Sequence, residues 1–258
     1  MYGPHQKPPF HRAADDLERK PPEYLLYTQA QSHKFRGFPA ASDQTFGEMK
    51  AAYYGMVSQI YWQVGLIVAQ LQQQGLAEDA LIVFTSDHGM PAKGPFLLDC
   101  MLQVPLLIAG PGVAAGRTVS ELVEEVDLFP TISSFCDLEL PPWLQGQDLS
   151  QALAGQEARA PAPRERIYAE AIDKKCIRTS DWKYIHYPGK AYGELYDLRR
   201  DPHELYNLFA DQSHQVARMR AEFYQLLDDT EETIHPSYDR FEGVDPRTGT
   251  PLTHYHVW

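Results

Sequence analysis

Long apolar runs and clusters of basic residues are both missing from this sequence. No stretch approaches the roughly 18 consecutive apolar residues of a membrane-spanning helix, and the N-terminal MYGPHQKPPFHRAADD contains no apolar segment that could act as a secretory signal. The formal net charge is −12, with no basic stripe, whereas binding to phosphate backbones requires clustered lysine and arginine. We therefore predict a cytoplasmic protein that binds neither membranes nor nucleic acids; its oligomeric state stays open.

Cysteine is also scarce. The three cysteines, Cys100, Cys136 and Cys176, are far apart and odd in number, which argues against a disulfide framework or a zinc site and favours buried thiols in a reducing compartment. What the sequence does have is a globular composition, with 43% hydrophobic and 22% charged residues. Its 258 residues allow one large domain, or one domain with a small appendage.

The first part of the chain reads as an irregular segment followed by a long helix. Residues 1–44 are rich in proline and charge, so we expect a surface excursion with little regular structure. From Thr45, apolar residues recur three and four positions apart, the spacing of an amphipathic helix that would end at Gly75. These residues are Tyr53, Val57, Ile60, Val64, Ile67 and Leu71.

Two apolar runs follow the helix and predict an α/β fold. Residues 80–86, ALIVFTS, and 103–112, QVPLLIAGPG, are apolar on both faces, as expected of parallel strands that helices cover on each side. The segment VDLFPTISSF predicts a short helix capped by Asp127, with Pro130 in its first turn. We therefore expect an α/β domain with a mainly parallel sheet.

The character of the sequence changes near residue 160, where we place a domain boundary. Residues 151–165 are small, polar and rich in proline, as in a linker, and they divide an α/β domain (1–160) from a C-terminal subdomain (161–258). In the subdomain we expect three short antiparallel strands, a turn-rich segment, an amphipathic helix and an irregular tail. In that order the segments are RIYAEAI, KCIRTS, WKYIHYP, GELYDLRRDPHELYNL, SHQVARMRAEFYQLLDD and GVDPRTGTPLTHYHVW.

The first apolar strand ends in Ser-Asp-His-Gly, residues 86–89. Because ligands of open α/β sheets bind beyond the carboxyl ends of the strands, Asp87 and His88 are well placed to turn toward a bound cation. A carboxylate and a neutral imidazole are reasonable ligands for a divalent metal. The alternative is an aspartate that caps a turn beside an exposed histidine, and the dipeptide alone does not decide between the two.

Several motifs occur in a fixed order between Lys50 and Leu227. They are AAYYGMVSQIYWQVGLIVAQL, LIVFTSDHG, KGPFLLD, QVPLLIAGPGV, VEEVDLFPTI, LQGQDLSQAL and IRTSDWKYIHYPGKAYGELYDLRRDPHELYNL. In this order they resemble the later half of the catalytic domain of the sulfatase family, in the alkaline phosphatase superfamily, together with its C-terminal subdomain. The resemblance implies part of an alkaline-phosphatase-like sandwich, followed by a small antiparallel sheet packed by a helix.

The resemblance also implies a site that hydrolyses a small-molecule sulfate ester. Asp87 and His88 match the Asp-Asn or Asp-His pair that binds the active-site cation, usually Ca²⁺ and sometimes Mn²⁺, and Lys93 matches the lysine that contacts the sulfate. Cleavage of a sulfate ester builds charge on its bridging and equatorial oxygens, which a metal ion and an ammonium group stabilise more in the transition state than in the ground state. The alternative for Lys93 is a solvated loop lysine.

The sequence departs from the family pattern in two places. It contains no Cys/Ser-x-Pro-x-Arg motif, which supplies the family's nucleophile, and Asp15 and Asp16 are poor substitutes for the early Asp-Asp pair of the metal site. The loop between His88 and Lys93 is also shorter than the usual family loop.

From these departures we expect a truncated, C-terminal portion of a sulfatase with little or no turnover. Such a portion would expose apolar surface or an unpaired strand edge. Two alternatives stay open. One is a relative of the phosphodiesterases or phosphonate monoester hydrolases, and the other is a non-catalytic remnant that binds a partner through its sheet edge.

We expect several other polar residues to have no catalytic or metal-binding role. We expect Asp127 to cap a helix rather than to act as a catalytic acid, and Lys183, His186 and Tyr187 to lie at the surface. The remaining histidines show no ligand spacing; they are His203, His214, His235 and those of the terminal HYH.

Overall fold

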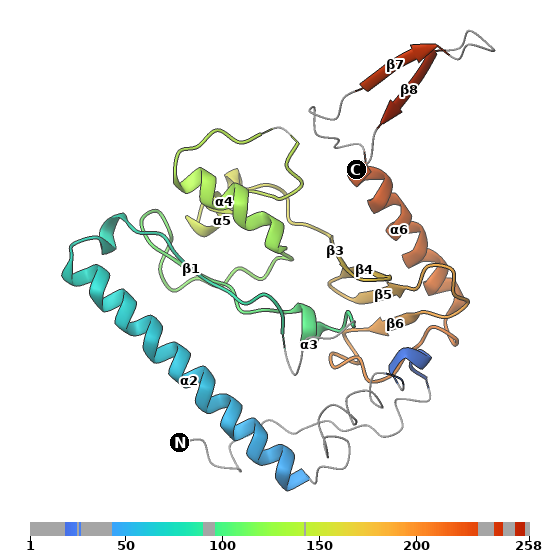
Figure 1. The fold of residues 1–258 in the computed structure, drawn as a ribbon, viewed down its shortest axis with the longest axis horizontal. Helices are drawn as coiled ribbons and strands as arrows, with labels where there is room; N and C mark the ends of the chain where they lie inside the picture. The colour runs from blue at the N-terminus through green and yellow to red at the C-terminus, as the bar shows by residue number, and fades with distance from the viewer. Residues whose placement is uncertain are drawn as a thin grey trace.

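The computed structural model of the chain describes residues 19–24, 26, 43–89, 96–141, 143–231, 240–244 and 251–255. Its α-helices are α2 (Asp43–Gln73), α3 (Asp99–Leu102), α4 (Leu128–Phe135), α5 (Ser150–Leu153) and α6 (Ser213–Glu231). The 3-10 helices are η2 (Ala77–Asp79), η3 (Glu125–Asp127) and η4 (Glu157–Arg159). The strands are β1 (Ile82–Phe84), β2 (Leu107–Ala109), β3 (Arg166–Ala171), β4 (Lys174–Thr179), β5 (Trp182–His186), β6 (Glu194–Asp197), β7 (Arg240–Val244) and β8 (Pro251–Tyr255). Figure 1 shows α2 along one side of the molecule and the β3–β6 sheet at the other.

The predicted long helix is confirmed as α2, which begins at Asp43 rather than Thr45. Gly75 follows its end with a φ of 70°, a left-handed conformation that glycine adopts without steric cost. The N–H groups of Gly75 and Leu76 then donate to the carbonyl oxygens of Gln72 and Leu71 at 3.1 and 2.9 Å, which satisfies carbonyls at the end of the helix.

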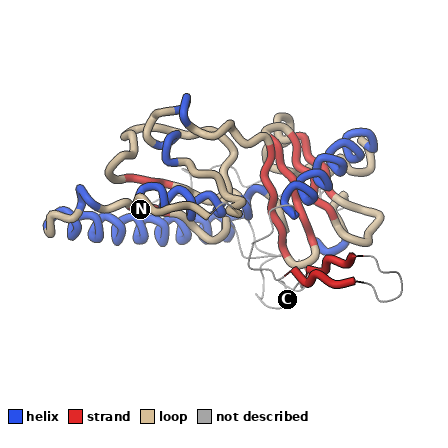
Figure 2. Tube along the Cα trace, turned by 90° about the horizontal axis from the view of Figure 1, so that it is seen from above, coloured by secondary structure: helices blue, strands red, loops and turns tan. Residues whose placement is uncertain are grey.

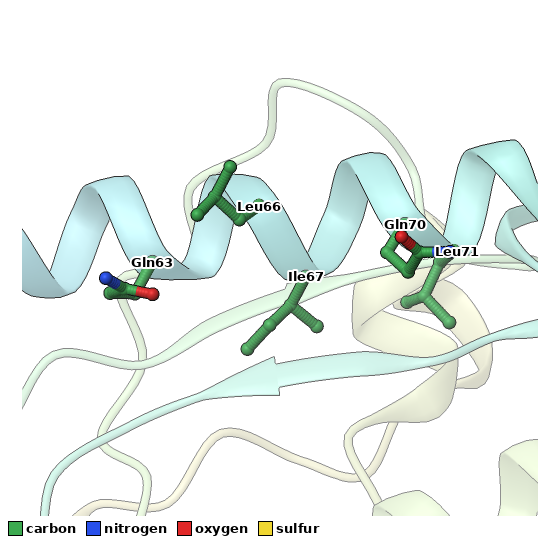
Figure 3. Close-up of a pocket in the computed structure, with 5 residues that line it drawn as sticks. All are labelled: Gln63, Leu66, Ile67, Gln70 and Leu71. Carbon is green, nitrogen blue, oxygen red and sulfur yellow. The ribbon is translucent and has the colours of Figure 1, made fainter.

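The apolar side chains of α2 are largely exposed. Ile60, Trp62 and Ile67 retain 51%, 61% and 63% of their accessible surface. Figure 3 shows Ile67 and Leu71 pointing toward the strand that passes beneath the helix. Together with other side chains of α2 they line an open hollow of about 290 Å³. A helix that is apolar on several sides is normally covered by other parts of a protein, so this one exposes an unusual amount of apolar surface.

The two apolar runs do form strands, but the predicted parallel relation between them is wrong. β1 and β2 pair antiparallel, with Ile82 opposite Ala109 and Phe84 opposite Leu107. A parallel pair requires a crossover that returns the chain to the same end of the sheet, and the described part of this connection holds one short helix, α3. Within the described residues no third strand joins this two-stranded sheet.

The predicted antiparallel strands of the second half are confirmed as β3, β4 and β5, which form a four-stranded sheet with β6 in chain order. Strand β6 lies in the segment that the sequence predicted as turns, so that prediction is wrong there. Its four residues are too short for a recognisable alternation, and pairing with β5, such as Tyr184 opposite Leu195, creates the strand.

Both faces of this sheet are covered. On one face α6 packs its Val216, Met219 and Phe223 against residues of β4, β5 and β6, and Figure 2 shows the helix alongside the strands. On the other face a second cluster joins the sheet to the segment before α3, and it includes Leu97 and Ile185. Charged residues of the sheet such as Lys174, Lys183 and Glu194 are therefore buried.

The end of the chain differs from the prediction of an irregular tail. β7 and β8 pair antiparallel, with Phe241 opposite His254, and Figure 1 shows this hairpin apart from the main body. The irregular segment expected over residues 1–44 falls mostly outside the described residues. Among the helices that are described, none is both long enough and apolar enough to cross a bilayer.

Candidate metal-binding site

Strand β1 delivers two adjacent polar residues to its carboxyl end. After Phe84 the chain leaves the strand, and the hydroxyl of Ser86 donates to the carbonyl oxygen of His88 at 3.0 Å. This local bond folds residues 86–88 into a tight bend. The side chain of Asp87 is 75% exposed and that of His88 is 33% exposed, so both remain accessible to a ligand from solvent.

The two side chains face each other. Nε2 of His88 lies 3.9 Å from Oδ1 of Asp87. Nδ1 of His88 lies 2.7 Å from the carbonyl oxygen of Gly89, which accepts a hydrogen bond and therefore favours a proton on Nδ1. In the neutral imidazole this tautomer leaves a lone pair on Nε2, the ring nitrogen that lies near the carboxylate. Metal-binding histidines are commonly oriented by such a bond.

Gly89 fixes the position of this bend against helix α3. Its N–H donates to the carbonyl oxygen of Met101 at 2.7 Å. A Cβ atom on residue 89 would lie 2.1 Å from the carbonyl oxygen of Cys100, so no larger residue fits without moving the backbone. The glycine of the Ser-Asp-His-Gly motif therefore permits the close contact between the end of β1 and α3.

The pair suits a divalent cation but does not form a complete site. A carboxylate oxygen and an imidazole nitrogen at this spacing are compatible with Ca²⁺ or a transition metal such as Mn²⁺. Among the described residues, no group of three or more histidine, cysteine, aspartate or glutamate side chains is arranged to hold a metal ion. Asp15 and Asp16 lie outside the described residues, and so does Lys93.

Asp127 has a structural role, as predicted, but its side chain caps η3 rather than α4. Its side chain makes no capping bond to α4. Instead its Oδ2 accepts from the N–H of Glu124 at 2.7 Å, which caps η3, and its two oxygens bind both Nη atoms of Arg164. The hydrogen bond to Asp127 raises the pKa of Arg164. With no exposed surface, Asp127 is not accessible to a substrate.

The predicted surface positions of Lys183 and Tyr187 are wrong. Lys183 is fully buried and Tyr187 is 2% exposed, whereas His186 is half-buried. On β5, Lys183 shares a face with Ile185, two residues further on, and that face packs on Leu97. Period-two alternation could have placed Lys183 on that face, but the sequence did not reveal that the face is covered.

The prediction that all three cysteines are buried is correct for one of them only. Cys176 is buried, as expected of a packed thiol, and burial raises its pKa to about 12. Cys100 and Cys136 are exposed, so the prediction is wrong for these two. Cys100 is the second residue of α3, and Cys136 directly follows the last residue of α4.

Comparison with protein families identifies the fold. A model described as "Sulfatase" matches residues 8–138, and one described as "N-sulphoglucosamine sulphohydrolase, C-terminal" matches residues 87–232. Together they cover both the candidate site and the four-stranded sheet. The chain belongs to the sulfatase family.

Individual relatives agree with this assignment. Arylsulfatase K from Bos taurus is 30% identical over 205 residues, which are 72% of this chain and 37% of the relative. The structure of the phosphonate monoester hydrolase of Agrobacterium radiobacter is 26% identical with a TM-score of 0.73, covering 98% of this chain and 56% of that one. The structure of BT4656 with its substrate D-glucosamine-2-N,6-O-disulfate is 26% identical with a TM-score of 0.61, covering 86% and 50%. The chain thus spans between about a third and about a half of the length of these relatives.

Proposed function

We propose that this chain carries part of the active site of a metal-dependent sulfuric ester hydrolase, in which Asp87 and His88 hold the cation. The observation that carries the proposal is the facing pair at the end of β1, with Nε2 of His88 3.9 Å from Asp87 Oδ1 and Nδ1 engaged by the Gly89 carbonyl. Ca²⁺ is the proposed ion, on the strength of the family resemblance. Mn²⁺ is the alternative, because carboxylate oxygen suits both ions and imidazole suits the transition metal better.

The proposed substrate is a small-molecule sulfate ester, contacted by Lys93. A cation at this site would supply positive charge to the non-bridging oxygens of the ester. The ammonium group of Lys93, five residues beyond His88, would add a hydrogen-bond donor for the leaving oxygen. Gly89 and α3 hold the bend in place, so the two ligands are positioned before the ester binds.

We further propose that the isolated chain turns over sulfate esters very slowly or not at all. Its 258 residues contain no Cys/Ser-x-Pro-x-Arg motif and therefore no nucleophile of the expected type. Charge stabilisation without a nucleophile leaves only attack by water. Purified chain with Ca²⁺ and 4-nitrophenyl sulfate should release 4-nitrophenol no faster than the Asp87→Ala variant. Hydrolysis clearly above that variant would contradict the proposed lack of turnover.

The choice of ester is tested by binding rather than turnover. In the presence of Ca²⁺, 4-nitrophenyl sulfate should shift the NMR amide signals of residues 87–93, and Lys93→Met should remove most of that shift. The second candidate ligand is a phosphonate monoester, favoured by the likeness to a phosphonate monoester hydrolase over 98% of this chain. A larger response to 4-nitrophenyl phenylphosphonate than to the sulfate would support that reading instead.

A non-catalytic role is the remaining candidate. It is favoured by the exposed apolar side chains of α2 and by the unpaired edges of β1 and β2 within the described residues. In that case the chain would bind a partner through this surface. Size-exclusion chromatography combined with metal titration separates the cases, because a partner-binding remnant would associate without responding to Ca²⁺ or Mn²⁺.

A further inference from the structure

A buried cluster of charged residues joins the four-stranded sheet to helix α3. Nζ of Lys183, on β5, lies 2.5 Å from Oδ1 of Asp99 and 2.6 Å from Oε1 of Glu204. The same ammonium group donates to the carbonyl oxygen of Leu97 at 3.1 Å. Lys183 is fully buried and Glu204 is 2% exposed, so these contacts form away from solvent.

The charges of this cluster balance. Nε of Arg178, on β4, lies 3.1 Å from Oδ2 of Asp99 and supplies a second positive charge. Two carboxylates thus face two cations, which is the condition for keeping charges in a protein interior. Burial lowers the pKa of Lys183, but Cys176, Glu204 and Asp99 outweigh burial and raise the pKa above its ordinary value. Lys183 therefore stays charged in this site.

Glu204 adopts an unusual backbone conformation within the cluster. Its φ is 55°, in the left-handed region that residues with a side chain rarely occupy. Its second carboxylate oxygen accepts from the N–H of Asp99, the first residue of α3, at 2.5 Å. Strained conformations persist where the surrounding contacts hold them. Here the conformation directs the carboxylate of Glu204 to both Lys183 and α3.

Helix α3 in turn contacts the candidate metal site. The N–H of Gly89 donates to Met101 at 2.7 Å, and the backbone of residue 89 approaches Cys100 so closely that a Cβ atom would not fit. Gly89 also accepts the hydrogen bond from Nδ1 of His88. An unbroken series of short contacts therefore runs from Lys183 through Asp99 and α3 to the imidazole of His88.

We propose that Lys183 is a positioning residue for the metal site, acting with Glu204 through α3 and Gly89 to orient His88. This inference rests on the proposed function of Asp87 and His88 as cation ligands. Loss of the cluster would release α3 and with it the orientation of the imidazole.

The test uses a double variant that removes one cation and one carboxylate together, so that the buried charges stay balanced. Lys183→Met alone leaves two carboxylates with one cation, whereas Lys183→Met/Glu204→Gln leaves Arg178 paired with Asp99. Lys174→Met is the matched control, because Lys174 is a buried lysine of the same sheet whose ammonium group pairs with Asp173 at 2.6 Å. Far-UV circular dichroism and unfolding midpoints establish that each variant is folded at the temperature of measurement.

Two readouts are compared in the full chain. The first is the position of the His88 imidazole nitrogen signals in metal-free protein, assigned by their loss in His88→Gln. The second is the affinity for Ca²⁺, followed by NMR titration. We expect the double variant to shift the His88 signals and to weaken Ca²⁺ binding about 10-fold or more, as for other residues that support metal ligands. The Lys174→Met control should leave both unchanged.

The outcomes separate this inference from the proposed function. Unchanged His88 signals in the folded double variant, with unchanged Ca²⁺ affinity, would overturn the positioning role while the metal site stands. If the unaltered chain binds neither Ca²⁺ nor Mn²⁺, the proposed function fails, and the His88 signals alone decide whether Lys183 orients the imidazole.

Discussion

The guanidinium group of Arg164 forms two hydrogen bonds with the carboxylate of Asp127, with Nη1···Oδ2 and Nη2···Oδ1 distances of 2.6 and 2.8 Å. The Arg164 side chain is 11% exposed and that of Asp127 is fully buried. Asp127 is the last residue of η3, and Arg164 lies two positions before the first residue of β3. It therefore ties the segment carrying α4 to the start of the four-stranded sheet.

Replacement of Asp127 by alanine should strongly destabilise the protein. The change leaves the buried Arg164 without its main partner and removes the acceptor for the N–H of Gln147, at 2.7 Å. Breaking a buried ion pair by removing one partner costs about 3–5 kcal/mol. Urea unfolding followed by circular dichroism measures the loss in the free energy of unfolding.

The matched control is Asp229→Ala, which removes another aspartate–arginine pair. Asp229 lies 3.3 Å from Arg166, but its side chain is 51% exposed. An exposed pair contributes about 1 kcal/mol or less. Equal losses for the two variants would contradict the structural role assigned to Asp127.

Gly89→Ala should disturb the candidate site through its backbone. The added methyl group would meet the carbonyl oxygen of Cys100 at 2.1 Å, so either the bend after β1 or α3 must move. We expect a loss of about 1–3 kcal/mol in unfolding free energy, typical of overpacking, and a shift of the NMR signals of His88.

Gly65→Ala serves as the control for a glycine-to-alanine change. A Cβ atom at residue 65, in the middle of α2, meets nothing within 4 Å. Because alanine favours helix over glycine, this variant should be more stable by up to about 1 kcal/mol. The two substitutions thus have opposite predicted signs, and a stabilising Gly89→Ala would refute the close contact with α3.

Thiol labelling should divide the cysteines into two classes. Cys100 and Cys136 are exposed and should react with an aromatic disulfide reagent in the folded protein, whereas the buried Cys176 should react after denaturation. The reactive form is the thiolate, and burial raises the pKa of Cys176 to about 12. Three equally fast thiols in the folded state would contradict the buried position of Cys176.

The same group makes stability depend on alkaline pH. The pKa of Cys176 rises from its ordinary value of 9.0 to about 12 on folding, so the unfolded chain loses this proton at a lower pH than the folded chain. Its contribution is complete below pH 9 and is lost as the pH rises toward 12. Cys176→Ala should reduce the decline in unfolding free energy between pH 8 and 10, measured by urea titration; an unchanged decline would count against this cause.

The exposed apolar residues of α2 should promote self-association. Ile60 and Ile67 are 51% and 63% exposed, and contiguous apolar surface of this kind favours contact with another molecule. Sedimentation velocity should show concentration-dependent association that Ile60→Lys/Ile67→Lys reduces. Ile172→Lys is the control, because Ile172 is 94% exposed in the turn between β3 and β4, away from α2. Equal effects of the two changes would indicate nonspecific adhesion.

The sequence predicted local elements better than their surroundings. The amphipathic patterns correctly located α2 and α6, and the segment with Asp127 and Pro130 correctly located α4, because these signals are local information. The direction of β2 relative to β1 was predicted incorrectly, because an apolar strand carries no mark of its pairing partner. Strand β6 was missed for the same reason: its pairing with β5, rather than its own four residues, creates it.

In the candidate site, too, the sequence revealed residues that are adjacent in the chain but not those brought together by folding. The motif around Asp87 and His88 was visible in sequence, since both ligands and the following glycine are adjacent. The cluster of Lys183, Asp99 and Glu204 was not, because these residues are brought together only by the packing of α3 on the sheet. The domain boundary near residue 160 and the role of Lys93 stay predictions.

Titration of the isotope-labelled chain with Ca²⁺, repeated with Mn²⁺, tests the central claim most directly. Ca²⁺ should shift the amide and imidazole signals of residues 87–89 in a saturable manner, with a dissociation constant on the order of 10⁻³ M for a site with few protein ligands. Mn²⁺ should broaden the same signals first. Asp87→Ala should remove both effects. Signals of residues 87–89 that stay unchanged while other acidic residues respond would contradict the account.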